Sequence, residues 1–442
     1  MDSGNKLKVF LFFVADVAAL YAGLFITLLI RYGGQFYAQF LDADAIPFTI
    51  IFALWIIVFY IAGLYDLRHL RNNLDFLKTL FLCLGVNAAL AVLLFYLVPG
   101  FGIAPKTTLL IFIVIFAVIE MFWRQWMNNV ISSGKAPNKV LLVGNGNAAE
   151  ELVEVIKANP QIGYDIKEWI SHDGPETLKK IRHLAESHAI NMIVVPRHLK
   201  QDRATANLLY ELLSHGTEIY DFTNFYELVM RKVPLAELEE TWFLENLFLQ
   251  NSFSAFFKRI TDFIFISLLT IVAIPLLPII ALGVMLSSEG PVILTQKRVG
   301  KNGVLYDHYK FRTMFVSEKN TWLDEDNSRV TAIGKLLRST HLDELPQIVN
   351  VLQGDISLVG PRPDLIDFYD QLKDKIPYYN IRTIIKPGLT GWAQVNFPAT
   401  VSAEETKERL SYDLYYLKNR SAVLDLLIIL KTIRTVVAAL GK

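Results

Sequence analysis

Cysteine is almost absent from this chain of 442 residues, which contains only Cys83. A disulfide framework is therefore excluded, and a lone thiol in an apolar stretch is usually a small buried hydrophobe. Charged residues are also scarce, at 19% of the chain, and the formal net charge is +0. Without a positive excess there is no support for general nucleic-acid binding, so any anion binding must be local.

Apolar residues make up 53% of the chain, which is typical of a membrane protein with large polar domains. Four apolar runs come first, and each approaches the ~20 residues that cross a hydrocarbon core. The runs span residues 9–30, 45–64, 79–98 and 107–123. We therefore predict four transmembrane helices within residues 1–130.

Basic residues predict the orientation of these helices. Lysine and arginine precede the first run, fill the second loop and follow the fourth run, whereas the other two loops carry only Arg31 and Lys106. The second loop contains Arg68, Arg71 and Lys78. Because cytoplasmic loops carry the basic excess, the N-terminus, the second loop and everything after residue 124 are expected in the cytoplasm.

Two carboxylates, Asp16 and Glu120, fall inside the apolar runs. Ionisable residues at such positions are functional candidates by default. A structural role is favoured here, because Asp16 lies near the cytoplasmic end of its run and Glu120 is one helical turn before Arg124.

Residues 136–236 predict a doubly wound, Rossmann-like α/β domain. A short apolar strand from Lys139 leads through Gly144-Asn145-Gly146 into a helix, and further strands are expected near residues 166–170, 192–196 and 218–222. The turn matches the looser G-x-G-x-x-A fingerprint of dinucleotide sites. The simpler interpretation, that the glycines only permit a tight turn, is favoured because no clear acidic residue closes the second strand before Asp173.

A fifth apolar segment, about residues 260–287, contains Pro275 and Pro278 at its middle. Proline removes a backbone hydrogen bond and bends a helix. Both flanks are basic, which favours a re-entrant helix that enters and leaves on the cytoplasmic side over a kinked fifth span. The chain then continues as a polar domain, about residues 250–442, that ends in an amphipathic helix. Ser421 is the expected N-cap of that helix, which either lies on the membrane surface or covers the domain core.

Two adjacent carboxylates, Asp343 and Glu344, mark the candidate site of this last domain. Adjacent helical residues point about 100° apart, so the two cannot do the same task, and cations must keep both ionised. The cations expected around them are Lys297, Arg298, Lys310, Arg312, Arg338, Arg362 and Lys386. The alternative to a functional site is an ordinary pair of surface carboxylates beside a proline-rich turn. The carboxylate pair and these cations, next to a membrane segment, favour a site that acts on phosphate groups.

Five motifs carry a resemblance to a known family. They read QKRVG, YKFRTM, LDELPQIVNVLQGDISLVGPRPD, KPGLTGWAQVN and DLYYLKNRS. From about residue 253 to its end the chain resembles the bacterial sugar transferases, which are polyprenyl-phosphate hexose-1-phosphate transferases, also called monotopic phosphoglycosyl transferases. The four apolar runs and the α/β domain resemble the long form of that family.

The resemblance implies transfer of a hexose-1-phosphate from a UDP-sugar to undecaprenyl phosphate, with release of UMP, at the bacterial inner membrane. It implies that Asp343 attacks the β-phosphorus and forms a covalent intermediate. Glu344 would activate the acceptor or organise Mg²⁺, which would bridge Asp343 and the diphosphate. Lys310, Arg338 and Arg362 would neutralise phosphate charge, with Lys297, Arg298 and Arg312 as further phosphate ligands.

Two departures from the family pattern and one assembly state complete the expectations. His341 stands where a serine is usual, so we expect packing or an altered hydrogen bond there with catalysis intact. The helix break reads Ala273-Ile274-Pro275 where the family often has Ser-Pro. We expect a homo-oligomer, a dimer, with the α/β domain serving subunit contact or regulation.

One rival reading is a membrane-anchored, NAD-dependent nucleotide-sugar oxidoreductase or epimerase centred on residues 144–149. Tyr306 and Lys310 form the Y-x-x-x-K pattern that such enzymes use on a helix. Here the pattern alternates like a strand and lies in another domain, so chance explains it better. A transporter built on the apolar runs is a second rival, which their few polar residues disfavour.

Overall fold

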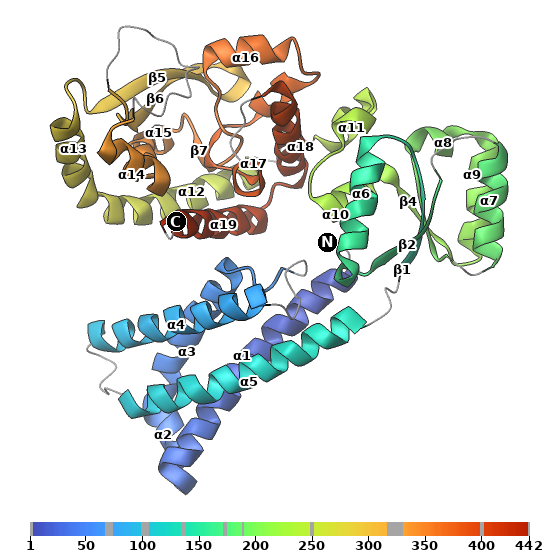
Figure 1. Cartoon of the computed structure of the whole chain (residues 1–442). Coiled ribbons are helices and arrows are strands. Elements are labelled where there is room, and N and C mark those ends of the chain that lie inside the picture. Colours follow the sequence, from blue (N-terminus) through green and yellow to red (C-terminus); the bar gives the residue numbers. More distant parts are fainter. Residues whose placement is uncertain are drawn as a thin grey trace. The chain divides into compact units, whose positions relative to one another are not determined.

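The chain folds into two compact units, which divide between Met230 and Arg231. The computed structural model (Figure 1) describes residues 3–66, 74–98, 106–133, 138–170, 175–187, 190–247, 252–315, 330–397 and 402–440. The loop arginines Arg68 and Arg71 and the carboxylate Asp173 lie outside the described residues.

Long apolar helices begin the first unit. They are α1 (Ser3–Tyr32), α3 (Ala45–Ile61), α4 (Leu74–Leu97) and α5 (Lys106–Ser133), with η1 (Gly33–Gln35), α2 (Phe36–Gln39) and η2 (Phe40–Asp44) between the first two. In the described part of the chain, three spans are long and apolar enough to cross a membrane: Leu7–Gln39, Phe76–Phe95 and Thr107–Val130. The helix α3, with 17 residues, is shorter than these spans. The chain is thus a membrane protein with about three candidate spans in this region.

Aromatic side chains form the core of these helices. Trp55 of α3 is fully buried, and its ring lies 5.5 Å from the rings of both Phe112 and Phe116 on α5. Arg124 is also fully buried, where it forms ion pairs with Glu120 at 2.5 Å and with Asp16 of α1. The expected pairing of Glu120 with Arg124 is therefore confirmed, and Asp16 joins it.

The α/β domain follows within the same unit. Its strands are β1 (Asn138–Val143), β2 (Tyr164–Ile170), β3 (Met192–Val195) and β4 (Glu218–Asp221). Its helices are α6 (Asn147–Ala158), η5 (Pro160–Ile162), α7 (Pro175–Glu186), α8 (Arg197–Gln201), α9 (Arg203–Ser214) and α10 (Phe222–Met230). The strands pair in parallel in the order β2-β1-β3-β4, as expected for a doubly wound sheet.

Successive side chains in a strand point to opposite faces, so each face of this sheet has its own hydrophobic core. Val140 and Leu142 of β1 pack with α6 and α10, whereas Leu141 and Val143 pack with α7 and α9 on the other face (Figure 1). The central strands β1 and β3 are buried on both sides and read as short continuous apolar runs, as is typical of a parallel sheet.

The second unit opens with short helices and the bent apolar pair. These elements are η6 (Leu235–Glu237), α11 (Glu240–Asn246), α12 (Ser252–Ala273) and α13 (Leu276–Ser287). A hairpin and two helices follow: β5 (Ile293–Val299), η7 (Lys301–Gly303), β6 (Leu305–Phe311), α14 (Ala332–Thr340), η9 (Leu342–Glu344) and α15 (Gln347–Gln353). The remaining elements are β7 (Ser357–Val359), α16 (Ile366–Lys373), η10 (Tyr379–Ile384), β8 (Gly388–Thr390), α17 (Trp392–Asn396), α18 (Ala403–Asn419) and α19 (Ala422–Leu440).

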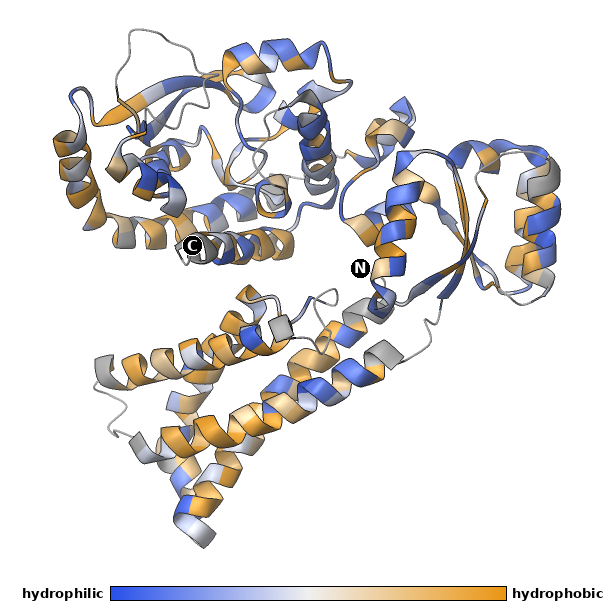
Figure 2. Ribbon diagram, viewed as in Figure 1, coloured by the Kyte–Doolittle hydropathy of each residue, from blue (hydrophilic) through white to orange (hydrophobic). Residues whose placement is uncertain are grey.

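The pair α12 and α13 is bent by 63° between Ile271 and Leu276. Pro275 stands at the break, as the N-cap of α13. Pro278 lies in the first turn of α13, where a missing N–H costs no intrahelical bond. Figure 2 shows both helices predominantly hydrophobic, and Leu286 is 79% exposed. The bend thus falls where the prolines predict it, and the pair keeps a large apolar surface outside the domain core.

The motif strands β7 and β8 pair in parallel through glycines that permit unusually close backbone contact. A Cβ on Gly388 would lie 2.1 Å from the Gly360 nitrogen, and a Cβ on Gly391 would lie 2.2 Å from the Gly360 oxygen. Only glycine fits such contacts. The VGPRP and KPGLTG motifs are therefore two sides of one packed unit, and that unit carries Arg362.

The final helix α19 begins at the predicted cap, since the Leu424 N–H donates to the Ser421 hydroxyl at 3.2 Å. Leu424 and Ile428 are buried against the domain, whereas Val423 and Leu426 are exposed. The helix is apolar on two sides, so it covers the core and still presents an apolar outer face.

Candidate active site

Asp343 and Glu344 lie on a single 3-10 turn, η9, between the helices α14 and α15. The helix α14 starts at Thr331, whose hydroxyl accepts from the Gly334 N–H at 2.8 Å, and it ends at His341 in the left-handed conformation, with φ of 56°. Histidine tolerates this conformation better than a bulky apolar residue does. The helix break therefore turns two adjacent carboxylates away from a regular helical path.

The strands β5 and β6 bring cations to one face of the hairpin. Arg298 pairs with Tyr306 in the antiparallel register, and Lys310 lies on the same face as Tyr306, because side chains two and four positions apart in a strand point the same way. Arg298 is only 9% exposed, and burial followed by the charge of Arg362 lowers its pKa to about 10. The strand-like alternation around Tyr306 and Lys310 is confirmed as β6, which spans Leu305–Phe311.

Asp343 and Lys310 influence each other electrostatically. Burial raises the pKa of Asp343, and the charge of Glu344 raises it further, while Lys310, His341 and Arg338 oppose the rise. Burial also lowers the pKa of Lys310 to about 8, with Arg298, Arg338 and Arg362 adding to the effect and Asp343 opposing it. A partly buried carboxylate thus lies within the field of several cations, which favour its ionised form against the opposing effects of burial and Glu344.

The neighbouring His308 is excluded as a proton carrier. Its ring is 4% exposed, and burial together with the charges of Arg298, Arg362 and Lys310 lowers its pKa to about 2. The neutral ring lies 3.2 Å from the Tyr306 hydroxyl. Because His308 stays uncharged at physiological pH, acid-base chemistry at this face must come from other groups.

The Arg362 side chain contacts the carboxylate pair through Glu344. Its Nη1 and Nη2 atoms each lie 3.4 Å from Glu344 Oε1, and its side chain is 42% exposed. The side chain of Arg338 is anchored differently, since its Nε donates to the Thr313 hydroxyl at 2.9 Å. The structure therefore brings Arg362, Arg338, Lys310 and Arg298 around Asp343 and Glu344.

Two predicted phosphate ligands lie apart from this cluster. Lys297 points to the opposite face of the hairpin from Arg298 and forms an ion pair with Asp307 at 2.9 Å. Arg312 is 5% exposed and donates to the Ser288 carbonyl at 2.5 Å. That Lys297 and Arg312 bind phosphate remains a prediction, because neither of these contacts tests it.

In the α/β domain, Gly144 and Gly146 both have positive φ, of 150° and 88°. The Phe222 and Pro196 side chains would lie 3.7 Å from a Cβ on Gly144. The turn thus needs glycine for its own conformation. Nucleotide binding at this turn stays a prediction. The rival reading loses its second element, because Tyr306 and Lys310 lie on a strand of the second unit.

Asp343 and Glu344 suit Mg²⁺ better than a metal that needs a full protein cage. No cluster of three His, Cys, Asp or Glu side chains that could hold a metal occurs within the described ranges. Mg²⁺ binds through one or two carboxylates together with water and substrate phosphates. The raised pKa of Asp343, caused by burial and by Glu344, leaves room for a further cation to stabilise its charge.

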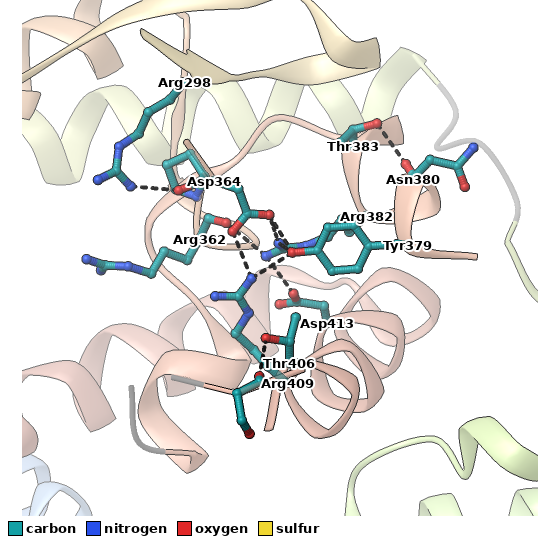
Figure 3. Close-up of polar contacts among 12 residues, drawn as sticks. Arg298, Arg362, Asp364, Tyr379, Asn380, Arg382, Thr383, Thr406, Arg409 and Asp413 are labelled. Carbon is teal, nitrogen blue, oxygen red and sulfur yellow. Dashed lines mark hydrogen bonds and ion pairs between the residues drawn. The ribbon is translucent and has the colours of Figure 1, made fainter. Parts of the chain in front are cut away.

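A buried ionic cluster around Asp364 was missed from the sequence. Its carboxylate accepts hydrogen bonds from the Tyr379 hydroxyl at 2.7 Å, from Arg409 at 2.8 Å and from Arg382 (Figure 3). Asp413, fully buried, pairs with Arg382 at 2.9 Å. The only sequence signal was that Asp364 lies two residues after Arg362, directly after Pro363. Its partners come from distant segments without a regular spacing.

Comparison with known proteins covers this whole region. The model of the bacterial sugar transferase family matches residues 253–439. The chain is 39% identical over 230 residues to the UDP-N-acetylgalactosamine-undecaprenyl-phosphate N-acetylgalactosaminephosphotransferase of Aeromonas hydrophila, covering 50% of this chain and 53% of that protein. It is 34% identical over 322 residues to the UDP-glucose:undecaprenyl-phosphate glucose-1-phosphate transferase of Klebsiella pneumoniae, covering 68% of each. With the Escherichia coli protein of the same name it shares 30% identity, covering 70% of this chain and 69% of that protein.

A bent apolar helix pair, joined to a domain with paired carboxylates among cations, defines a membrane-associated transferase. The chain belongs to the bacterial sugar transferase family. It spans about half the length of the Aeromonas protein and about two thirds of the other two.

Proposed function

We propose that this protein transfers a hexose-1-phosphate from a UDP-sugar to undecaprenyl phosphate, giving undecaprenyl-diphosphate-sugar and UMP. The observation that carries the proposal is the position of Asp343, a partly buried carboxylate on a helix break within the field of Lys310 and Arg338. The names of the three relatives, each an undecaprenyl-phosphate sugar phosphotransferase, support the substrate classes.

The reaction proceeds in two displacements at one phosphorus atom. A carboxylate oxygen of Asp343 bonds to the β-phosphorus of the UDP-sugar while the bond from that phosphorus to UMP breaks, and UMP leaves with the electron pair. An oxygen of the lipid phosphate then attacks the same phosphorus, and the Asp343 carboxylate is released unchanged. A covalent intermediate divides one difficult displacement into two easier ones.

The side chains around Asp343 bind the phosphate groups of the substrates and neutralise their charge. Lys310, Arg338 and Arg362 stabilise the charge on the phosphoryl oxygens, which is the main requirement of phosphoryl transfer. Glu344, held by Arg362, positions the acceptor or shares a metal with Asp343. Mg²⁺, when bound by Asp343 and Glu344, supplies further positive charge to the diphosphate.

The membrane placement follows from the apolar surfaces. The helix α3, which continues η2 and buries Trp55 in the shared core, completes four spans with α1, α4 and α5. The pair α12 and α13 enters and leaves the bacterial inner membrane on the cytoplasmic side, with both globular domains in the cytoplasm. Its exposed apolar face and 63° bend support this re-entrant path.

The α/β domain serves subunit contact or regulation in a homodimer, and the reaction is the first membrane step of a bacterial surface polysaccharide pathway. Deletion of residues 138–230 should therefore change assembly or regulation. An unaltered molecular mass in detergent, together with unaltered kinetics and regulation, would count against this part of the proposal.

Release of UMP from purified protein tests the main proposal. The assay contains undecaprenyl phosphate, Mg²⁺ and a panel of UDP-sugars that covers glucose, galactose and their N-acetylated forms. Replacing Asp343 by Asn should reduce turnover by at least roughly 10³-fold, since it removes the nucleophile. Incubation with a radiolabelled UDP-sugar and no acceptor should label the wild-type protein and leave Asp343→Asn unlabelled.

Asp370→Asn is the matched control, because Asp370 is an exposed carboxylate on α16 that pairs with Lys373. It should keep full activity. Thermal unfolding of both variants checks that each is folded. Substantial UMP release by folded Asp343→Asn protein would remove the covalent scheme, and no release by the wild type with any UDP-sugar would remove the proposed reaction.

A further inference from the structure

All four main-chain carbonyl groups of the segment Pro361-Arg362-Pro363-Asp364 accept a hydrogen bond. Proline has no N–H, so two of its four residues can offer only an acceptor. Gly388 N–H donates to the Pro361 carbonyl at 2.9 Å, and the Val299 N–H donates to that of Asp364 at 3.0 Å. The two central carbonyls are bound by guanidinium groups instead of backbone. This is an unusual way to fix a loop, because most buried carbonyls are satisfied by backbone partners.

The two guanidinium groups are those of Arg298 and Arg382. Arg298 Nη1 donates to the Pro363 carbonyl at 2.7 Å, and Arg382 Nη2 donates to the Arg362 carbonyl at 2.8 Å. Arg382 is 3% exposed, so its geometry depends on what surrounds it. Its Nη1 donates to the Asp364 carboxylate, which also accepts from Arg409. One buried centre therefore binds both the side chain and the main chain of the segment.

The charges of this centre balance. Two arginines, Arg382 and Arg409, face two aspartates, Asp364 and Asp413. Burial alone would raise the pKa of Asp364, but Arg382 and Arg409 lower it to about 2, so the carboxylate stays ionised at any pH at which the protein works. The Asp364 carboxylate is therefore a permanent charge and takes no part in proton transfer.

The Arg362 side chain leaves this centre in another direction. Figure 3 shows it extending away from Asp364 and Tyr379, and its guanidinium reaches Glu344 at 3.4 Å. A half-exposed arginine has many rotamers, and its reach depends on where its backbone is fixed. The carbonyl of Arg362 itself is the group that Arg382 binds.

We infer that Asp364 and Arg382 are positioning residues, which fix the main chain of Arg362 so that its guanidinium faces the carboxylate pair and the donor's diphosphate. The inference rests on the proposed function, because it assigns Arg362 to the phosphates of a nucleoside diphosphate sugar. The residues act through Arg362 and touch no substrate atom.

A double-mutant cycle tests the inference on the full-length protein in detergent or nanodiscs. Asp364→Asn should raise KM for the UDP-sugar by roughly 10- to 100-fold with a smaller change in kcat, because a misplaced binding group loses most of its effect. In an Arg362→Ala background, Asp364→Asn should change KM by less than about twofold, because the interaction it supports is already gone. Full multiplication of the two effects would overturn the inference.

A milder variant serves as the control for misfolding of Asp364→Asn. Tyr379→Phe removes one hydrogen bond to Asp364 and keeps the ring, so it should fold even where Asp364→Asn does not. The same cycle with Arg362→Ala should again show no further loss. Lys373→Ala, on the exposed surface of α16, is the matched control and should leave KM unchanged.

Hydrogen exchange tests the positioning role independently of the proposed transferase function. Without substrate, a peptide covering residues 356–366 should exchange faster in Asp364→Asn and in Tyr379→Phe than in the wild type. Unchanged exchange in both folded variants would overturn the positioning role. Absence of UMP release by the wild type would remove the proposed function and leave the exchange result, and hence the role of the cluster in fixing this loop, intact.

Discussion

Each unit of this protein buries a guanidinium among carboxylates, and the two clusters differ in what they hold. In the first unit, Arg124 links Asp16 of α1 with Glu120 of its own helix, and it donates to the Leu64 carbonyl at 2.7 Å, beyond the end of α3. In the second unit, Arg382 links Asp364 with the main chain of Arg362. The first cluster joins helices and the second fixes the loop that carries Arg362. Burial and ionic pairing alone therefore do not identify an active site.

The largest effect on stability is expected in the membrane helices. Arg124→Met should lower the free energy of unfolding by about 3–5 kcal/mol, because it leaves Asp16 and Glu120 buried without their cation. Turnover per folded molecule should not change. The measurement is thermal unfolding in detergent, alongside UMP release normalised to folded protein.

A triple variant is the control for that prediction. Replacing Asp16 by Asn and Glu120 by Gln in the Arg124→Met background removes the stranded charges, and most of the lost stability should return. If Arg124→Met instead reduced turnover in proportion to its stability loss, the contrast between the two clusters would be broken.

Arg362→Ala should have the next largest effect, this time on binding. Loss of a charged hydrogen-bond donor should weaken handling of the UDP-sugar by about 1.5–3 kcal/mol, read as KM, without changing the melting temperature. Arg362→Lys keeps the charge and loses the planar fork, so it should recover only part of the loss. Kinetics identical to the wild type would contradict the role given to Arg362.

Alkaline pH should act through Lys310, whose pKa burial lowers to about 8. Above that value the amine is neutral, so kcat/KM for the donor should fall as pH rises, and Lys310→Arg should move the decline to higher pH. Stability should change in the opposite sense. Because the folded-state pKa is below the unfolded value, the cost of the charged amine is complete below about pH 8 and disappears towards the unfolded pKa of about 10.4.

An equal decline in the wild type and in Lys310→Arg would assign the alkaline limb to another group. The pH series therefore needs both proteins, measured in the same detergent and at constant Mg²⁺.

The smallest effect is expected at an exposed ion pair. Arg182 and Glu211 lie 2.9 Å apart, each about half exposed. Arg182→Ala should shift the melting temperature by no more than about 1–2 °C and leave UMP release unchanged, because exposed pairs contribute little. A large shift would show that position in the α/β domain, and not burial, decides how much an ion pair contributes.

Local patterns predicted the elements well. The alternation around Tyr306 and Lys310 became β6, the strands expected within residues 136–236 became a parallel sheet, and Ser421 caps the last helix. These features depend on neighbours a few residues apart. The carboxylate pair was found for the same reason, because Asp343 and Glu344 are adjacent.

Contacts between distant segments were not predictable in this way. Asp364, Arg382 and Arg409 meet only because α18 and η10 pack against the proline loop, and nothing in their spacing signals it. Whether Lys297 or Arg298 faces the site depends on strand parity, which a shift of one residue reverses. On α19, the amphipathic pattern left open which face covers the core, because Leu424 and Ile428 are buried while Val423 and Leu426 form an apolar outer face.

The Pro361–Asp364 segment is anchored by its main-chain oxygens, so its geometry does not depend on the side chain at position 362. That independence makes the position suitable for chemical substitution. Citrulline introduced at residue 362 would match arginine in shape and lack its charge, while the surrounding anchors stayed in place. Because citrulline also replaces one NH2 donor by a carbonyl oxygen, a single semisynthetic protein would measure the combined contribution of the charge and of the full donor set on an unchanged main chain.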